Sequence, residues 1–432
     1  MPGPASAETA PATTAVTGSA RSATAIVGTA PTSTVAAAGP VVPCPTPAVP
    51  RSPRPRPPAG DEADREIGGP ELATPGLVVP PGAKAPPAVS ATSWVVADLD
   101  SGAVLGGCGP HEASPPASVQ KLLLATTVLT KIDPKQVVTI TRQDLNFEPG
   151  SSAVGLLEGG RYPVETLWLG LMLNSGNDAA NVLARLGGGT DGVAGTLREM
   201  NENARRLGAR QTHAVTPSGL DGPGQFTSAY DLALIARSCF ADAAFRRYTS
   251  AQRAQIPAQP PKTKTGFQIQ NDNQLLLNYK GAIGGKTGFT DQARHTYVGA
   301  AQRGGRRLVV TLLGAEARPL RGWQQGAALL DWGFAQPREA SVGRLVDPGE
   351  LDRPKASPPA PGVAAGASAA TRPAAHQSWT LRSIMITAAA VLGALALILA
   401  AVGSRRGAHR VGRRRAGARG GGTRSNVRAR AR

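Results

Sequence analysis

Only the stretch from residue 89 to residue 338 carries enough large apolar residues to build a sizeable buried core. The flanking segments, 1–88 and 339–383, are dominated by Ala, Pro, Thr and Ser. Such segments bury too little apolar surface to offset the entropy lost on ordering. The sequence therefore predicts one folded domain at 89–338. It also predicts a disordered N-terminal segment, which includes a possible degenerate signal peptide, and a Pro/Ala-rich linker after the domain.

The order of elements within 89–338 predicts the fold class. Residues 94–105 show a strand, a turn and a second strand, and residues 296–301 and 307–314 form a hairpin around Gly304 and Gly305. Several buried helical patterns lie between these two groups. Strands at both ends of the domain predict an α+β fold, in which an antiparallel sheet built from both chain ends packs against a helical subdomain.

The end of the chain predicts a membrane anchor. Ile384 to Val402 is an uncharged, mostly apolar run of 19 residues, and a spanning helix needs about 20. From Gly403 to Arg432 there are 11 Arg and no Asp or Glu. This excess of Arg predicts a cytoplasmic tail at 403–432 and an extracytoplasmic folded domain. The net charge of +18 therefore belongs largely to the tail and gives no reason to expect a nucleic-acid partner.

Cysteine and histidine positions argue against a metal site. Cys44, Cys108 and Cys239 fit no zinc-binding spacing, and the five His residues form no helical pair. We expect neither a metal nor a cofactor. Cys239 follows an apolar helical run and is expected to be a buried thiol. Whether Cys44 and Cys108 pair is left open.

Ser118 and Lys121 are the first candidates for catalysis. Two prolines and an Ala precede Ser118, and an apolar run, predicted to be a buried helix, follows Lys121. A spacing of three places both side chains on one side of a helix. An amine beside a serine hydroxyl can make that serine nucleophilic. Taken alone the pair is weak, because Ser-x-x-Lys also arises from a helix-capping Ser and a solvated Lys.

Two further motifs follow in order: Ser175-Gly176-Asn177 and Lys286-Thr287-Gly288. Together with Ser118-x-x-Lys121 and the Pro-Ala-Ser start, this order resembles the low-molecular-weight D-alanyl-D-alanine carboxypeptidases, peptidase family S11. The resemblance covers roughly residues 94–334. Its other parts are 150–152, 175–180, 216–222, 228–231 and 271–273.

The residue types suggest a division of roles. Ser118 is the expected nucleophile, and Lys121, with a pKa lowered by burial and by a nearby cation, is the expected general base. Ser175 is placed to relay a proton to the leaving amine, and Asn177 to hold Lys121 and the substrate. Lys286 and Thr287 are expected to bind a free carboxylate, and Gly288 to allow close approach of substrate. By the family pattern, the backbone N–H groups of Ser118 and Phe289 hold the oxyanion.

A second Lys-Thr-Gly occurs at Lys264-Thr265-Gly266. The family motif follows an Asn-x-Asn-x-Leu-Leu segment and a Gly-rich turn and then continues as a strand. Lys286 has this context and Lys264 lacks it, so we assign the motif to Lys286.

The sequence departs from the family pattern at Arg294-His295, where small residues are usual. Two interpretations stay open: a solvated strand entry, or side chains that narrow the groove or contact a substrate carboxylate. An additional β-domain, which many relatives carry after the catalytic domain, is not expected here.

The resemblance implies removal of the terminal D-Ala from peptidoglycan stem pentapeptides through an acyl-enzyme, with β-lactams as inhibitors. One alternative is a class A β-lactamase-like hydrolase. Its Glu-x-x-Leu-Asn pattern is missing between Ser175 and Lys286. Another alternative is a non-catalytic wall-binding relative.

Overall fold

The computed structural model describes residues 40–58 and 60–353. Its main element is a seven-stranded antiparallel sheet in the order β1-β3-β2-β10-β9-β8, with β11 pairing with β3. The early strands β1, β3 and β2 lie side by side, and β2 pairs with β10, which begins the group of late strands. This order confirms a sheet built from both chain ends. The strands are β1 Leu77–Val78, β2 Ser93–Asp98, β3 Ala103–Cys108, β8 Ala282–Thr290, β9 Arg294–Arg303, β10 Arg306–Ala315 and β11 Gly343–Arg344.

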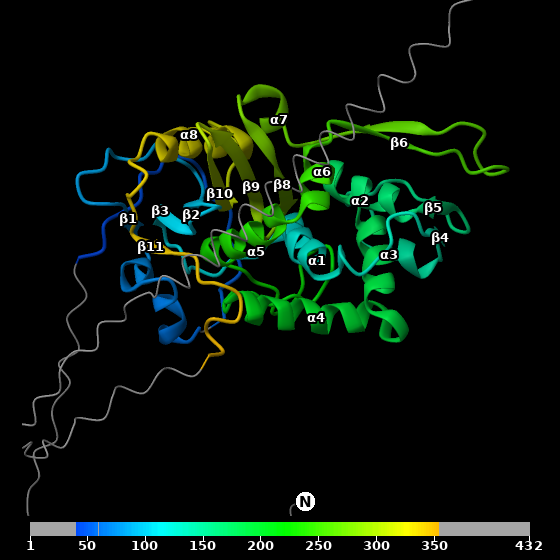
Figure 1. The fold of residues 1–432 in the computed structure, drawn as a ribbon, viewed down its shortest axis with the longest axis horizontal. Coiled ribbons are helices and arrows are strands. Elements are labelled where there is room, and N and C mark those ends of the chain that lie inside the picture. The colour runs from blue at the N-terminus through cyan, green and yellow to red at the C-terminus, as the bar shows by residue number, and fades with distance from the viewer. Residues whose placement is uncertain (1–39, 59, 354–432) are drawn as a thin grey trace, which may run out of the picture. The chain divides into compact units, whose positions relative to one another are not determined.

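Helices cover both faces of the sheet (Figure 1). The helix α8 (Gly322–Phe334) packs on β9 and β10. α5 (Ala229–Ala241) packs on β2 and β10 from the other face. Ser228 caps α5 by accepting a hydrogen bond from the backbone N–H of Asp231. Cys239 is a buried free thiol, as predicted.

The remaining helices form the other half of the domain, inserted between β3 and β8 (Figure 1). Two small hairpins, β4–β5 and β6–β7, belong to this half. Its helices and strands are α1 Lys121–Val128, α2 Val164–Leu173, α3 Asn177–Gly187, α4 Gly192–Leu207, α6 Ala243–Ser250, β4 Val137–Thr139, β5 Arg161–Pro163, β6 Arg253–Ile256 and β7 Phe267–Gln270. The short helix α7 (Leu275–Asn278) lies apart from this half and packs against β8 and α8. The 3₁₀ turns are η1 Glu62–Glu66, η2 Pro70–Ala73, η3 Ala117–Gln120, η4 Gln143–Leu145 and η5 Gly189–Asp191.

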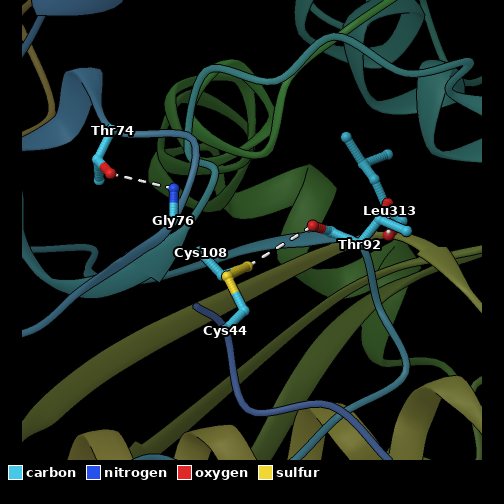
Figure 2. The surroundings of a disulfide bond; sticks show 6 residues. All are labelled: Cys44, Thr74, Gly76, Thr92, Cys108 and Leu313. Atoms are coloured by element: carbon cyan, nitrogen blue, oxygen red, sulfur yellow. Dashed lines mark hydrogen bonds between the residues drawn. A yellow bond between two sulfur atoms is a disulfide. The ribbon is translucent and has the colours of Figure 1, made fainter. Parts of the chain in front are cut away.

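The predicted start of the domain at residue 89 is wrong, because described residues before it pack on the domain. β1 extends the sheet, and Leu72 in η2 is fully buried. A disulfide joins Cys44 to Cys108 at the end of β3 (Figure 2). These few contacts therefore order residues before 89, although the average composition of that segment suggests disorder. Residues 1–39, which include much of the possible signal peptide, lie outside the described part.

The predicted end of the domain at residue 338 also needs correction. Residues 343–344 form β11, and Val342, Leu345 and Val346 are buried. These apolar positions are too few to stand out in a Pro-rich stretch. The remainder of the predicted linker, the proposed membrane span at 384–402 and the Arg-rich tail lie outside the described residues. Within residues 40–58 and 60–353, no helix has both the length and the apolar character needed to cross a bilayer.

Candidate active site

Ser118 lies in η3, at the point where a 3₁₀ turn leads into α1. Ala117 before it has a φ of 48°, which a residue with a side chain rarely adopts. Strain of this kind costs about 1–3 kcal/mol and is concentrated at functional sites. The neighbouring Gly219 is required, because a Cβ there would collide with the carbonyl oxygen of Ala117. Packing around Ser118 therefore fixes a backbone that the local sequence does not favour.

Lys121 is fully buried and binds three groups at once. Its Nζ donates to Ser118 Oγ at 2.9 Å, to Asn177 Oδ1 at 2.8 Å and to the carbonyl oxygen of Ser218 at 2.8 Å. Burial and then the charge of Lys286 lower the pKa of Lys121 well below its usual value, while Asp178 opposes the shift. A buried amine with a lowered pKa, in contact with a serine hydroxyl, is suited to remove that hydroxyl's proton.

The loop between α2 and α3 supplies Ser175 and Asn177. Ser175 has a φ of 63°, and its buried hydroxyl has no hydrogen-bond partner within the described part of the chain. Asn177 connects Lys121 to Ser151, because its Nδ2 donates to Ser151 Oγ at 2.9 Å. Ser175 thus has a free hydrogen-bonding group two residues before Asn177, which binds Lys121.

Lys286, Thr287 and Gly288 lie on β8, the last strand of the sheet. Burial lowers the pKa of Lys286 to about 8, and the charge of Asp272 opposes this shift. A Cβ at Gly288 would lie 2.8 Å from the backbone N of Ser118 and would collide with Thr296 Oγ1. Only glycine therefore allows β8 to pass this close to the Ser118 amide. Phe289, the next residue, has a side chain that is 48% exposed.

Several residues at the site were not predicted from the sequence. Asp178 accepts hydrogen bonds from four backbone N–H groups, and three of them belong to the loop that carries Val154. The Ser218 carbonyl binds Lys121, and Thr296 Oγ1 donates to the carbonyl oxygen of Pro116 at 2.8 Å. Asp178 and Ser218 belong to the segments 175–180 and 216–222 of the family resemblance. The sequence does not reveal, however, which groups bind the Asp178 carboxylate and the Ser218 carbonyl oxygen.

Arg294 makes defined contacts, so a purely solvated strand entry does not describe it. Its guanidinium forms a two-point ion pair with Glu316, with N–O distances of 3.1 and 3.3 Å. It also lies over the Phe289 ring, 5.3 Å from the centroid, and the His295 ring packs against Phe289 at 4.7 Å. Arg294 and His295 thus both pack against the Phe289 ring.

Within the described ranges, no group of three or more His, Cys, Asp and Glu residues is arranged to hold a metal ion.

Comparison with known proteins is consistent with this geometry. The family described as D-alanyl-D-alanine carboxypeptidase matches residues 81–317. The D-alanyl-D-alanine carboxypeptidase DacB2 of Mycobacterium tuberculosis is 46% identical over 274 residues, which cover 62% of this chain and 90% of the relative. DacD of Escherichia coli is 34% identical over 262 residues, which cover 57% of this chain and 64% of the relative, so this chain spans just under two thirds of it.

Solved structures show the same similarity. A D-alanyl-D-alanine carboxypeptidase from Mycobacterium tuberculosis shares 44% sequence identity with a TM-score of 0.58, over 62% of this chain and 100% of that one. The Streptomyces K15 DD-transpeptidase shares 28% identity with a TM-score of 0.56, over 58% of this chain and 99% of that one.

Proposed function

The chain belongs to the D-alanyl-D-alanine carboxypeptidases of peptidase family S11, and we propose that it removes the terminal D-Ala from peptidoglycan stem pentapeptides through a serine acyl-enzyme. One observation carries the proposal. The buried Lys121 amine contacts the Ser118 hydroxyl and Asn177 together, beside the second buried amine of Lys286.

In the proposed acylation step, neutral Lys121 takes the proton of Ser118 Oγ while that oxygen attacks the carbonyl of the penultimate D-Ala. The backbone N–H groups of Ser118 and Phe289 stabilise the oxyanion. Ser175 then passes its proton to the nitrogen of the leaving D-Ala and receives in exchange the proton that Lys121 took from Ser118, and the C–N bond breaks. A water molecule hydrolyses the ester, which releases the shortened peptide and restores the Ser118 hydroxyl.

Selection of a C-terminal residue is assigned to β8. Lys286 has a positive charge below a pH of about 8, and the Thr287 hydroxyl lies next to it in the sequence. Together they offer a cation and a hydroxyl donor to a free carboxylate. A β-lactam presents a reactive carbonyl and a carboxylate to the same groups, so we expect it to acylate Ser118.

Full-length protein in detergent provides the test. Mass spectrometry of a pentapeptide ending in D-Ala-D-Ala should show loss of one D-Ala, and a fluorescent penicillin should label the protein. Rapid turnover of penicillin, without a stable adduct, would instead indicate a β-lactamase. Absence of both labelling and cleavage would indicate a non-catalytic relative.

We also propose that residues 384–402 anchor the protein in the cell membrane, with the catalytic domain outside and residues 403–432 in the cytoplasm. The support is the apolar run and the Arg residues that follow it. Extraction of the protein from membranes only by detergent, and protection of the C-terminus from external protease in intact cells, would agree with this topology. Release of the protein by salt alone would contradict it.

A further inference from the structure

The N-terminal arm, residues 40–58, is held against the catalytic domain although it precedes the family match, which begins at residue 81. The Cys44–Cys108 disulfide fixes it to the end of β3 (Figure 2). Two backbone hydrogen bonds add to this, from Leu77 N to Val42 O at 2.8 Å and from Val89 N to Pro45 O at 3.2 Å. This arm therefore lies outside the residues that match the family, and it has a defined path.

Arg54 anchors the arm near the reactive serine. Its Nη2 donates to Ser114 Oγ at 3.3 Å, four residues before Ser118. Its Nη1 occupies the space that a Cβ at Gly314 would fill, so β10 carries a glycine where the guanidinium packs. The arm therefore reaches the Ser118 end of the domain with Arg54 inserted against β10.

Arg56, two residues later, is exposed and lines a recess of about 350 Å³. Pro115, Asp221 and Gln292 line the same recess. Asp221 connects it to β8, because Thr290 Oγ1 at the end of that strand donates to Asp221 Oδ1 at 2.7 Å. The recess thus begins where the strand that carries Lys286 ends.

The direction of the bound peptide follows from the proposed function, on which this inference rests. The substrate's terminal carboxylate lies at Lys286 and Thr287, and its scissile carbonyl lies at the Phe289 amide. The residues upstream of that carbonyl must therefore continue past Thr290, at about 3.3 Å per residue in an extended chain. Asp221, which binds Thr290 and lines the recess, lies at the start of this path.

The recess presents a cation and an anion to the same ligand group. Arg56 is not part of any ion pair within residues 40–58 and 60–353. Asp221 uses one oxygen for Thr290, which leaves the other to accept a further donor. We propose that Arg56 and Asp221 bind the zwitterionic end of a diamino dicarboxylic acid side chain, next to the D-Ala-D-Ala of the donor peptide. Arg56 holds its carboxylate, and Asp221 holds its ammonium group.

Two peptides that differ by one group test this subsite in the full-length protein. One has meso-diaminopimelate before D-Ala-D-Ala, and the other has L-lysine, which keeps the amine and lacks the carboxylate. We expect kcat/KM to favour the diaminopimelate peptide by about tenfold at low salt, because an Arg–carboxylate contact at an exposed site is modest and screened. Arg56→Ala should abolish this preference and leave kcat/KM for the lysine peptide unchanged.

Arg51→Ala is the matched control, because Arg51 is an exposed cation on the same arm and does not line the recess. It should retain the preference. An equal loss in both variants would show a general charge effect and overturn the subsite, as would a wild-type enzyme without preference. Failure to cleave either peptide would instead contradict the proposed carboxypeptidase activity.

Discussion

The same tripeptide, Lys-Thr-Gly, occurs in two regions of this molecule with different surroundings. Lys264-Thr265-Gly266 forms an exposed bend in the β6–β7 hairpin, where the Lys264 side chain meets solvent. Lys286-Thr287-Gly288 lies on β8, where Lys286 is only 2% exposed and has its pKa lowered to about 8. The chemistry of the second copy therefore comes from its surroundings, since the residues are identical.

Those surroundings are the buried amine of Lys121, the Ser118 hydroxyl, and β8 itself, which passes close to the Ser118 amide. Lys286 lies close enough to Lys121 for its charge to lower the pKa of Lys121. Lys264 lies instead in the exposed bend between β6 and β7. The comparison predicts that changes around β8 reduce activity and that changes at the exposed copy do not.

The largest effect is expected from Ser118→Ala. The nucleophile is lost while the strand and both lysines stay, so we expect kcat/KM to fall by more than about 10⁴-fold and penicillin labelling to disappear. Mass spectrometry of the protein after incubation with a penicillin measures the acyl adduct. An adduct of normal mass on the variant would place the reactive group elsewhere and remove the distinction between the two copies.

Lys286→Ala is expected to lower kcat/KM by about 10³-fold, because the substrate carboxylate then lies in a site without its cation. It also removes a charge that lowers the pKa of Lys121. In the wild-type enzyme, activity should rise as Lys121 loses its proton and fall above a pH of about 8, as Lys286 loses its charge. The alkaline decrease should be absent from the residual activity of Lys286→Ala.

A pH profile of kcat/KM for both proteins measures this difference. An alkaline limb that persists unchanged in the variant would assign the upper pKa to another group.

Gly288→Ala tests the close approach of β8 to η3. The added methyl would lie 2.8 Å from Ser118 N and against Thr296 Oγ1, so the strand must shift. A displacement of this size at the reacting groups is expected to lower kcat/KM by about 10²-fold. Steady-state kinetics give the loss, and an unchanged melting temperature would show that the effect is local to the site. Full activity of Gly288→Ala would mean that catalysis does not depend on the close approach of β8 to the Ser118 amide.

The sequence predicted the site's chemical groups better than the outline of the domain. Ser118, Lys121, Asn177 and Lys286 were recognisable because side-chain chemistry and order are visible in a sequence. The positive φ of Ser175 and the carbonyl of Ser218 were not, since packing between distant segments sets backbone geometry. The outer segments at 40–88 and 339–353 were missed because one disulfide and a few buried apolar residues order them.

The double variant Cys44→Ser, Cys108→Ser lacks the disulfide. We expect it to be less stable than the wild type but to have nearly the same kcat/KM. A native disulfide that closes a long loop contributes about 2–4 kcal/mol, so we expect a lower melting temperature by calorimetry. For a small substrate such as diacetyl-L-lysyl-D-Ala-D-Ala, kcat/KM should stay within about threefold, because Cys44 lies on the arm and not at β8. A large loss of activity at a temperature where the variant is folded would show that the arm supports the reactive centre itself.

The smallest effect is expected from Lys264→Ala. Lys264 is exposed, and none of the polar groups around Lys121 or Lys286 belongs to the β6–β7 hairpin. Surface substitutions of this kind change stability by less than about 0.5 kcal/mol, so kcat/KM, penicillin labelling and melting temperature should all match the wild type. Lys286→Ala, measured beside it, shows that the assays detect loss of the same residue type. A decrease in kcat/KM for Lys264→Ala would mean that the hairpin contacts the substrate, and exposure would no longer separate the two tripeptides.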